Sequence, residues 1–160
     1  MSNFTTPKNT YAYFDFPSPI IASASLDNTG TTDLAIGAVV LPASPLPAGT
    51  SIKRVVLLVK YRKIADSSGS NNAINIATGN NVKVQKAAGT LATALNLPDN
   101  SLACLASGEG SGDVIVGTTD IKSTVDEWSA TYNVQITDTK VDGNNLILYD
   151  VQCIIRVFYG

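Results

Sequence analysis

The C-terminal residues, from Leu146 onward, carry the clearest strand pattern in the chain. One set of alternate positions is apolar throughout: Ile147, Tyr149, Val151, Cys153, Ile155, Val157 and Tyr159. The opposite set includes Asp150, Gln152 and Arg156. Because successive side chains of a β-strand point to opposite faces, this pattern predicts a strand with one continuous buried face. Such a strand must be packed inside a sheet, and removing it should unfold the domain.

A second segment, Ser51–Ile64, is apolar on both faces at its centre. Its middle residues, Val55–Val59, are all aliphatic, and basic residues stand toward its two ends: Lys53, Arg54, Lys60, Arg62 and Lys63. A strand with two apolar faces lies in the middle of a sheet that is covered on both sides. At about 3.3 Å per residue it would extend roughly 45 Å, so we expect a bulge or bend within it.

Shorter strand patterns, separated by turn residues, account for much of the remaining chain. They cover Tyr11–Phe16, Ile20–Ser25, Thr32–Leu41, Ala73–Ala77, Val82–Lys86, Asp113–Ile121 and Thr131–Lys140. Asp142-Gly143 is the expected turn of the last hairpin, and at most one short helix is expected, near residues 98–106. About eight or nine strands at this spacing predict an all-β, two-sheet antiparallel β-sandwich, with a jelly-roll-like topology. We expect one domain, residues 11–160, preceded by an extended polar arm, residues 1–10.

The charge of the chain is low and unevenly distributed. Charged residues make up 15% of the chain and the net charge is −2. This argues against a dedicated nucleic-acid-binding protein, so no specific nucleic acid partner is expected. Residues 1–100 hold eight Lys and Arg against five Asp and Glu, whereas residues 101–160 hold three against eight. These halves either neutralise each other within one fold or pair between copies of the chain.

The chain contains no histidine. This excludes the imidazole-dependent hydrolase triads, His-ligated zinc and the commonest general base near neutral pH. The oxygen-rich segments 27–33 and 66–72 lack the spacing of a calcium loop, and Gly108, Gly110 and Gly112 lack the Lys-Ser/Thr of a phosphate loop. We therefore expect no catalytic residues, no metal, no cofactor and no enzymatic activity. Cys104 and Cys153 are either two buried thiols or one disulfide.

One cluster could still support binding or chemistry. Asp126 and Glu127 precede Trp128, the only tryptophan. A tryptophan beside carboxylates can form a sugar-binding platform, and two carboxylates can serve a glycosidase. The simpler interpretation is a solvated loop whose tryptophan anchors the next strand. The basic residues of Ser51–Ile64 could contact the phosphates of a nucleic acid, but no exposed aromatic residues are interleaved with them. They fit better as charges that protect a sheet edge, or as partners for the acidic C-terminal half of the chain.

No run of eighteen apolar residues occurs, so no membrane contact is expected. The segment Met1–Thr10 is polar and lacks the apolar core of a signal peptide, which indicates synthesis in a cytoplasm without secretion by the general route.

Three segments together resemble small β-sandwich structural proteins of bacterial and archaeal virus particles, such as capsid, decoration or turret subunits. They are Ile52–Arg62 (IKRVVLLVKYR), Gly112–Gly117 (GDVIVG) and Asn145–Tyr159 (NLILYDVQCIIRVFY). The resemblance covers most of the chain in style, as a Thr/Asn/Ser-rich, His-free sandwich with an N-terminal arm. It implies a virion location and a homo-oligomer that contacts other virion proteins, without a small-molecule ligand.

The arm fits this expectation in one of two ways. Its residues Thr5, Thr6, Pro7, Lys8 and Asn9 either order by lying across a neighbouring subunit or are frayed, as chain termini often are. A carbohydrate-binding or adhesive sandwich, with Trp128 and exposed tyrosine side chains as its platform, is the alternative function.

Overall fold

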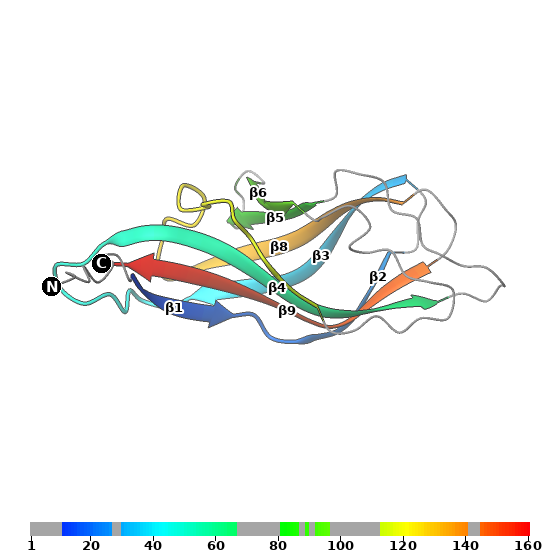
Figure 1. The fold of residues 1–160 in the computed structure, drawn as a ribbon, viewed down its shortest axis with the longest axis horizontal. Helices are drawn as coiled ribbons and strands as arrows, with labels where there is room; N and C mark the ends of the chain where they lie inside the picture. Colours follow the sequence, from blue (N-terminus) through cyan, green and yellow to red (C-terminus); the bar gives the residue numbers. More distant parts are fainter. Residues whose placement is uncertain are drawn as a thin grey trace, which may run out of the picture.

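The structure is a computed structural model that describes residues 11–26, 30–66, 81–86, 89, 92–96, 113–140 and 145–160. Within these residues the fold is all-β and contains no helix. The strands are β1 (Ala12–Pro17), β2 (Ile21–Leu26), β3 (Gly30–Leu41), β4 (Ile52–Asp66), β5 (Asn81–Lys86), β6 (Ala92–Asn96), β7 (Asp113–Val116), β8 (Ala130–Lys140) and β9 (Asn145–Tyr159). They run along the long axis of an elongated molecule (Figure 1).

The strands form two antiparallel sheets that face each other. The five-stranded sheet has the order β1-β9-β4-β7, and β2 pairs with β9 on the same edge as β1. β1 pairs with the C-terminal part of β9 and β2 with its N-terminal part, so the two act as one interrupted edge strand. The four-stranded sheet has the order β3-β8-β5-β6. The two-sheet antiparallel β-sandwich predicted from the sequence is confirmed.

The pairing is nested about the middle of the chain. β5 pairs with β6, β4 with β7, β3 with β8, and β1 and β2 with β9, so each pair is enclosed by the next. Rolling this long ribbon brings β4 against β9 and β5 against β8, which closes the two sheets. This arrangement is that of a jelly roll.

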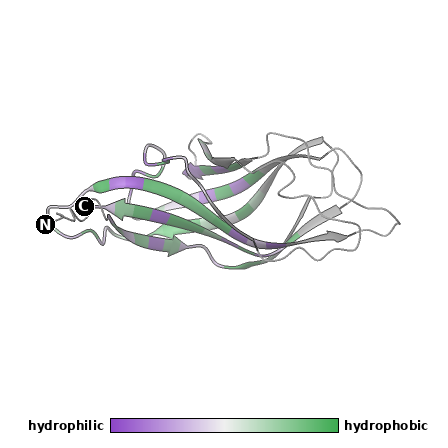
Figure 2. Ribbon diagram, in the orientation of Figure 1, coloured by the Kyte–Doolittle hydropathy of each residue, from purple (hydrophilic) through white to green (hydrophobic). Residues whose placement is uncertain are grey.

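The core lies between the sheets and is built from alternate residues of the long strands. β8 contributes Tyr132, Val134 and Ile136, and β9 contributes Val151, Cys153, Ile155 and Val157. β4 is buried on both faces, since Val55 to Val59 are all at most 6% exposed. The prediction of a central strand covered on both sides is confirmed, and Figure 2 shows the apolar stretch along β4 between polar ends.

The predicted continuous face of the last strand is wrong at its N-terminal end. Lys60 pairs with Gln152 but Arg62 pairs with Tyr149, so two β9 residues lie opposite Tyr61. One of them, Asp150, has a positive φ of 52°. This bulge reverses the alternation, so Leu148 rather than Tyr149 is buried. The bulge or bend expected in the partner strand is found between Ile52 and Arg54, where Lys53 is an extra residue of β4.

Other boundaries differ from the predictions. β6 was not predicted, and β7 ends at Val116 instead of continuing to Ile121. Beyond β7 the chain still follows β4, because Gly117 N donates to Leu57 O at 2.7 Å and Ile121 N donates to Val55 O at 2.9 Å. The predicted strand 73–77, the helix near 98–106, the turn at Asp142-Gly143, Cys104 and the arm 1–10 lie outside the described residues.

A serine between two prolines joins the halves of the edge strand. Ser18 lies between β1 and β2 and is 3% exposed. Its N–H donates to Cys153 O at 2.7 Å, while the Cys153 N–H donates to the Ser18 hydroxyl at 3.0 Å. The Ser18 hydroxyl oxygen thus accepts the Cys153 N–H, which would otherwise bond to a backbone carbonyl of the edge strand. Pro17 and Pro19 have no N–H, so the Ser18 N–H is the backbone donor at this point of the edge. Gly37 of β3 packs here, since a Cβ on it would lie 3.1 Å from Cys153 Sγ and 3.3 Å from Ser18 Oγ.

Candidate functional site

Trp128 packs against the edge of the core. It is half-buried, and its ring meets Phe16 of β1 edge-on, with 5.7 Å between the ring centroids. The next residue, Ser129, has a φ of 55° and donates its N–H to Pro42 O at 2.8 Å. These contacts fix the start of β8, as expected for a tryptophan that anchors the next strand.

Asp126 and Glu127 are exposed and line a hollow of about 280 Å³ with Lys86, Gly89, Ser123 and Thr124. Glu127 forms an ion pair with Lys86, and this hydrogen bond raises the pKa of the Lys86 ammonium. Trp128 is not among the residues that line this hollow. The structure therefore does not combine the tryptophan and the two carboxylates into one platform.

The outer face of the five-stranded sheet is aromatic and charged. Tyr13 is 50% exposed and lies beside Phe158, with ring centroids 5.7 Å apart. Arg156 holds Asp15 through two hydrogen bonds, at 2.8 and 2.9 Å, and its guanidinium lies 4.2 Å from the centroid of Tyr13. The hydrogen bonds to Asp15 raise the pKa of the Arg156 guanidinium.

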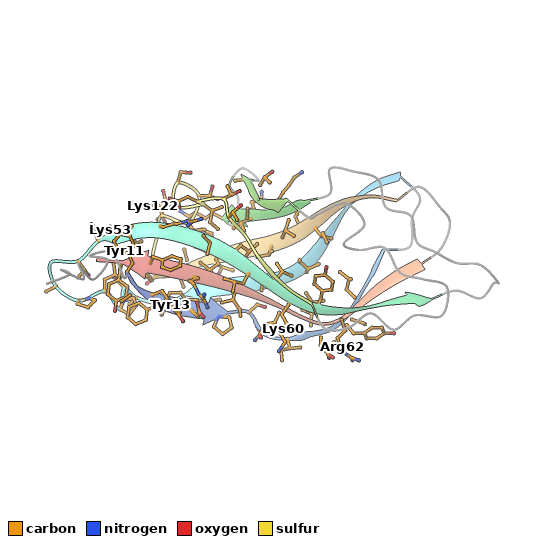
Figure 3. All side chains as sticks on the ribbon, in the orientation of Figure 1. Tyr11, Tyr13, Lys53, Lys60, Arg62 and Lys122 are labelled. Atoms are coloured by element: carbon orange, nitrogen blue, oxygen red, sulfur yellow. The ribbon has the colours of Figure 1, made fainter. Side chains whose placement is uncertain are left out.

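Further cations follow β4 on the same sheet (Figure 3). Arg62 pairs with Asp150 at 2.7 Å, but within the described part of the chain neither Lys53 nor Lys60 pairs with a carboxylate. Tyr11, Lys53 and Lys122 gather at the end where β9 finishes, whereas Lys60 and Arg62 lie farther along β4. This end supplies the exposed aromatic side chains that the sequence alone did not place beside the basic residues of β4.

A second hollow, of about 360 Å³, opens at this end. Its lining residues come from four separate segments: Tyr11, Lys53, Arg54, Asp120 and Phe158. Arg54 Nη2 donates to Thr118 O at 2.5 Å, which orients the guanidinium. Asp120 Oδ1 accepts the N–H groups of Val55 at 3.1 Å and of Lys122 at 3.0 Å. Sequence reasoning missed this site, because only the fold brings these segments together.

The outer face of the four-stranded sheet carries few charges in the three rows that contain Val40, Ala38 and Ala35. Strand register places its side chains in rows across the sheet: Ala38, Asn133 and Gln85 in one, and Ala35, Gln135, Lys83 and Thr93 in the next. Val40, 62% exposed, pairs with Thr131 beside them. Among the described residues of these rows, Lys83 carries the only charge.

Cys153 is the buried cysteine among the described residues. Burial raises the pKa of the Cys153 thiol to about 12, so it stays protonated and inert near neutral pH. The described residues include no cluster of three potential metal ligands of the His, Cys, Asp and Glu types. They also contain no helix with the length and hydropathy needed to cross a bilayer.

Comparison with known proteins adds no relationship. No protein-family model matches the sequence, and no curated protein matches it significantly.

Proposed function

We propose that this protein is a non-enzymatic structural subunit of a virus particle, a capsid, decoration or turret protein, that assembles with copies of itself. In this role it would reside in the virion and contact other virion proteins.

The outer face of β3, β8 and β5, with few charges in the three rows that contain Val40, Ala38 and Ala35, carries the proposal. Around Val40 its side chains are small or short, as in Ala38, Thr131 and Asn133, and Val40 exposes 62% of its surface to solvent. The cores of protein interfaces are depleted in charged residues, and short side chains lose little conformational entropy when a partner covers them. A second copy of the chain, with the same face, fits such a surface.

The jelly-roll strand order supports the same proposal by analogy. Double-sheet jelly rolls occur in viral capsid proteins, and also in lectins and cupins, so the fold alone does not choose among them. The placement of Trp128 against Phe16 argues against the tryptophan-based glycan platform, because the ring is engaged with the core.

The mass of the particle in solution tests the proposal. We expect a homo-oligomer of defined mass by light scattering, and Val40→Lys should weaken assembly about ten-fold or more, because a buried lysine must be desolvated. Ser23→Lys is the matched control, since Ser23 is an exposed residue on the edge strand β2 of the other sheet. A wild-type monomer at high micromolar concentration would contradict the proposal.

The arm provides a second readout in the same samples. If residues Thr5, Thr6, Pro7, Lys8 and Asn9 lie across a neighbouring subunit, trypsin will cut after Lys8 slowly in the oligomer and rapidly in the Val40→Lys monomer. Equal cleavage rates would instead mean that the arm is frayed.

A further inference from the structure

We propose that the hollow lined by Tyr11, Lys53, Arg54, Asp120 and Phe158 binds an acidic sugar, a carboxylate-bearing pyranose at the accessible end of a glycan. This inference does not rest on the assembly proposal. The hollow belongs to the five-stranded sheet, and the proposed assembly face belongs to the four-stranded sheet.

Two cations at the hollow are available for the carboxylate. Lys53 and Arg54 are exposed neighbours at the register shift where β4 begins, and within the described residues neither forms an ion pair. Arg54 is held by its hydrogen bond to Thr118 O, so its remaining N–H groups are oriented before a ligand arrives. A guanidinium fixed in this way favours a planar carboxylate, which it can bind through two parallel hydrogen bonds.

Two aromatic rings provide the apolar part of the site. Tyr11 is 46% exposed and Phe158 is half-buried. The Tyr11 ring lies over Gly160, where an added Cβ would be 3.2 Å from its Cδ1 and 3.8 Å from the Cε of Lys53. The Tyr11 ring and the Lys53 side chain thus both lie beside the backbone of Gly160. The C–H face of a pyranose can pack on such rings, in the common pattern of an apolar lining with a few placed polar groups.

Asp120 distinguishes a sugar from a phosphate chain. Its Oδ1 is occupied by two backbone N–H groups, whereas within the described residues its Oδ2 has no hydrogen-bond partner. A carboxylate oxygen at the hollow can accept hydrogen bonds from sugar hydroxyls, whereas the phosphodiester groups of a polynucleotide have no donor to offer it. The volume of about 360 Å³ is at the small end for ligand pockets, which suits one or two sugar rings.

Titration calorimetry with three probes tests the site in the full-length protein. The probes are a trimer of galacturonic acid, the corresponding neutral galactose trimer, and an oligothymidylate of about ten nucleotides. We expect the uronic acid trimer to bind at least about ten-fold more tightly than either of the other two, because only it satisfies the cations and Asp120 together.

Substitutions then locate the binding. Arg54→Ala and Tyr11→Ala should each weaken binding of the acidic trimer about ten-fold or more. Lys60→Ala is the matched control: Lys60 is an exposed cation on the same strand, roughly 20 Å from Arg54 at about 3.3 Å per residue, and its removal should change affinity less than about two-fold. Urea unfolding of each variant checks that the fold is kept.

Asp120→Asn separates the two kinds of polyanion. Asparagine keeps an oxygen that can accept the two backbone N–H groups but replaces the facing carboxylate oxygen with a donor. Binding of the acidic sugar should therefore fall, whereas binding of the oligothymidylate should rise. The proposal is overturned if the oligothymidylate binds most tightly, if Lys60→Ala acts as strongly as Arg54→Ala, or if no acidic sugar binds.

Discussion

The two outer faces of this jelly roll cover the same core but differ in chemistry. On the five-stranded sheet, β1, β4 and β9 present Tyr13, Arg54, Lys60, Arg156 and Phe158. On the four-stranded sheet, β3, β5 and β8 present alanine, valine, threonine, asparagine and glutamine, with Lys83 as the only charge in the described rows. Since the inward residues of both sheets are equally aliphatic, the core does not explain the difference.

The difference indicates two kinds of contact. Long cationic side chains retain rotamer freedom and water when exposed, so a face that carries them suits ligands that supply an opposite charge. Short uncharged side chains lose little entropy or hydration when covered, so the other face suits a lasting contact with protein. The two faces can therefore work at the same time without competing.

Deleting residues 156–160 should have the largest effect, because it affects both faces through the core. The deletion removes the fully buried Val157 and the partners of both β1 and the start of β4. Loss of these pairs and of the apolar burial is comparable with the whole stability of a small domain, about 5–15 kcal/mol. We expect no cooperative unfolding transition in urea.

Deleting Gly160 alone is the control, since it removes two backbone bonds with Ser51, each 3.2 Å long, and the close approach to Tyr11, but no buried side chain. Hydrogen exchange of the truncated chain sharpens the comparison. Protected amides in β8 would mean that the four-stranded sheet folds without the five-stranded sheet. This result would contradict the view that both sheets depend on one shared core.

Gly37→Val should have the next largest effect, because it adds a side chain where β3 packs closely against Cys153 and Ser18 of the other sheet. The new side chain would crowd Cys153 Sγ and Ser18 Oγ, so the free energy of unfolding should fall by about 1–3 kcal/mol in urea titrations. Ala35→Val on the same strand points to solvent and should change it by less than about 0.5 kcal/mol. Equal effects at the two positions would show that the approach of the sheets is not tight.

Asp15→Asn should have the smallest effect on stability. It changes the charge of the five-stranded sheet's outer face and so increases the difference in charge between the two faces. The Asp15–Arg156 pair is partly exposed, so its loss should lower the free energy of unfolding by less than about 1 kcal/mol. It frees one positive charge on the five-stranded sheet, so retention on a cation exchanger should increase. Asp126→Asn makes the same change in net charge away from this sheet face and should increase retention on the exchanger less. Equal retention of the two variants would mean that net charge alone, and not its position, governs binding to the exchanger.

The long central strands could be predicted from sequence because their patterns are local. Val55–Val59 is apolar on both faces, and the alternation through Val151, Cys153 and Ile155 identifies the buried side of β9. The bulge at Asp150 could not be predicted, since an extra residue in a strand is defined only by the register of its partner. β6 (ATALN) has one β-branched residue, Thr93, and no aromatic residue, so its strand signal is weak, and its pairing with β5 places it in the sheet.

The candidate sites depended on the fold even more. The sequence places Asp126, Glu127 and Trp128 together, but packing directs the tryptophan toward Phe16, a residue from the opposite end of the chain. The hollow at Tyr11 and Phe158 has no local signature, because its lining side chains meet only after β1, β4 and β9 have paired. Alternation identifies a core position, but it does not identify which distant residues become neighbours.

The nested strand order also has a consequence for how the chain is made. β4, the central strand of its sheet, pairs on one side with β9, which the ribosome produces only after every other strand described here. Until then, the apolar edge formed by Val55–Val59 lacks one of its two partners during translation. Long-range antiparallel pairing is slow, and unpaired apolar strands aggregate readily. Nascent chains that stall before residue 145 should therefore bind chaperones, and the basic residues that flank this strand help to keep it soluble.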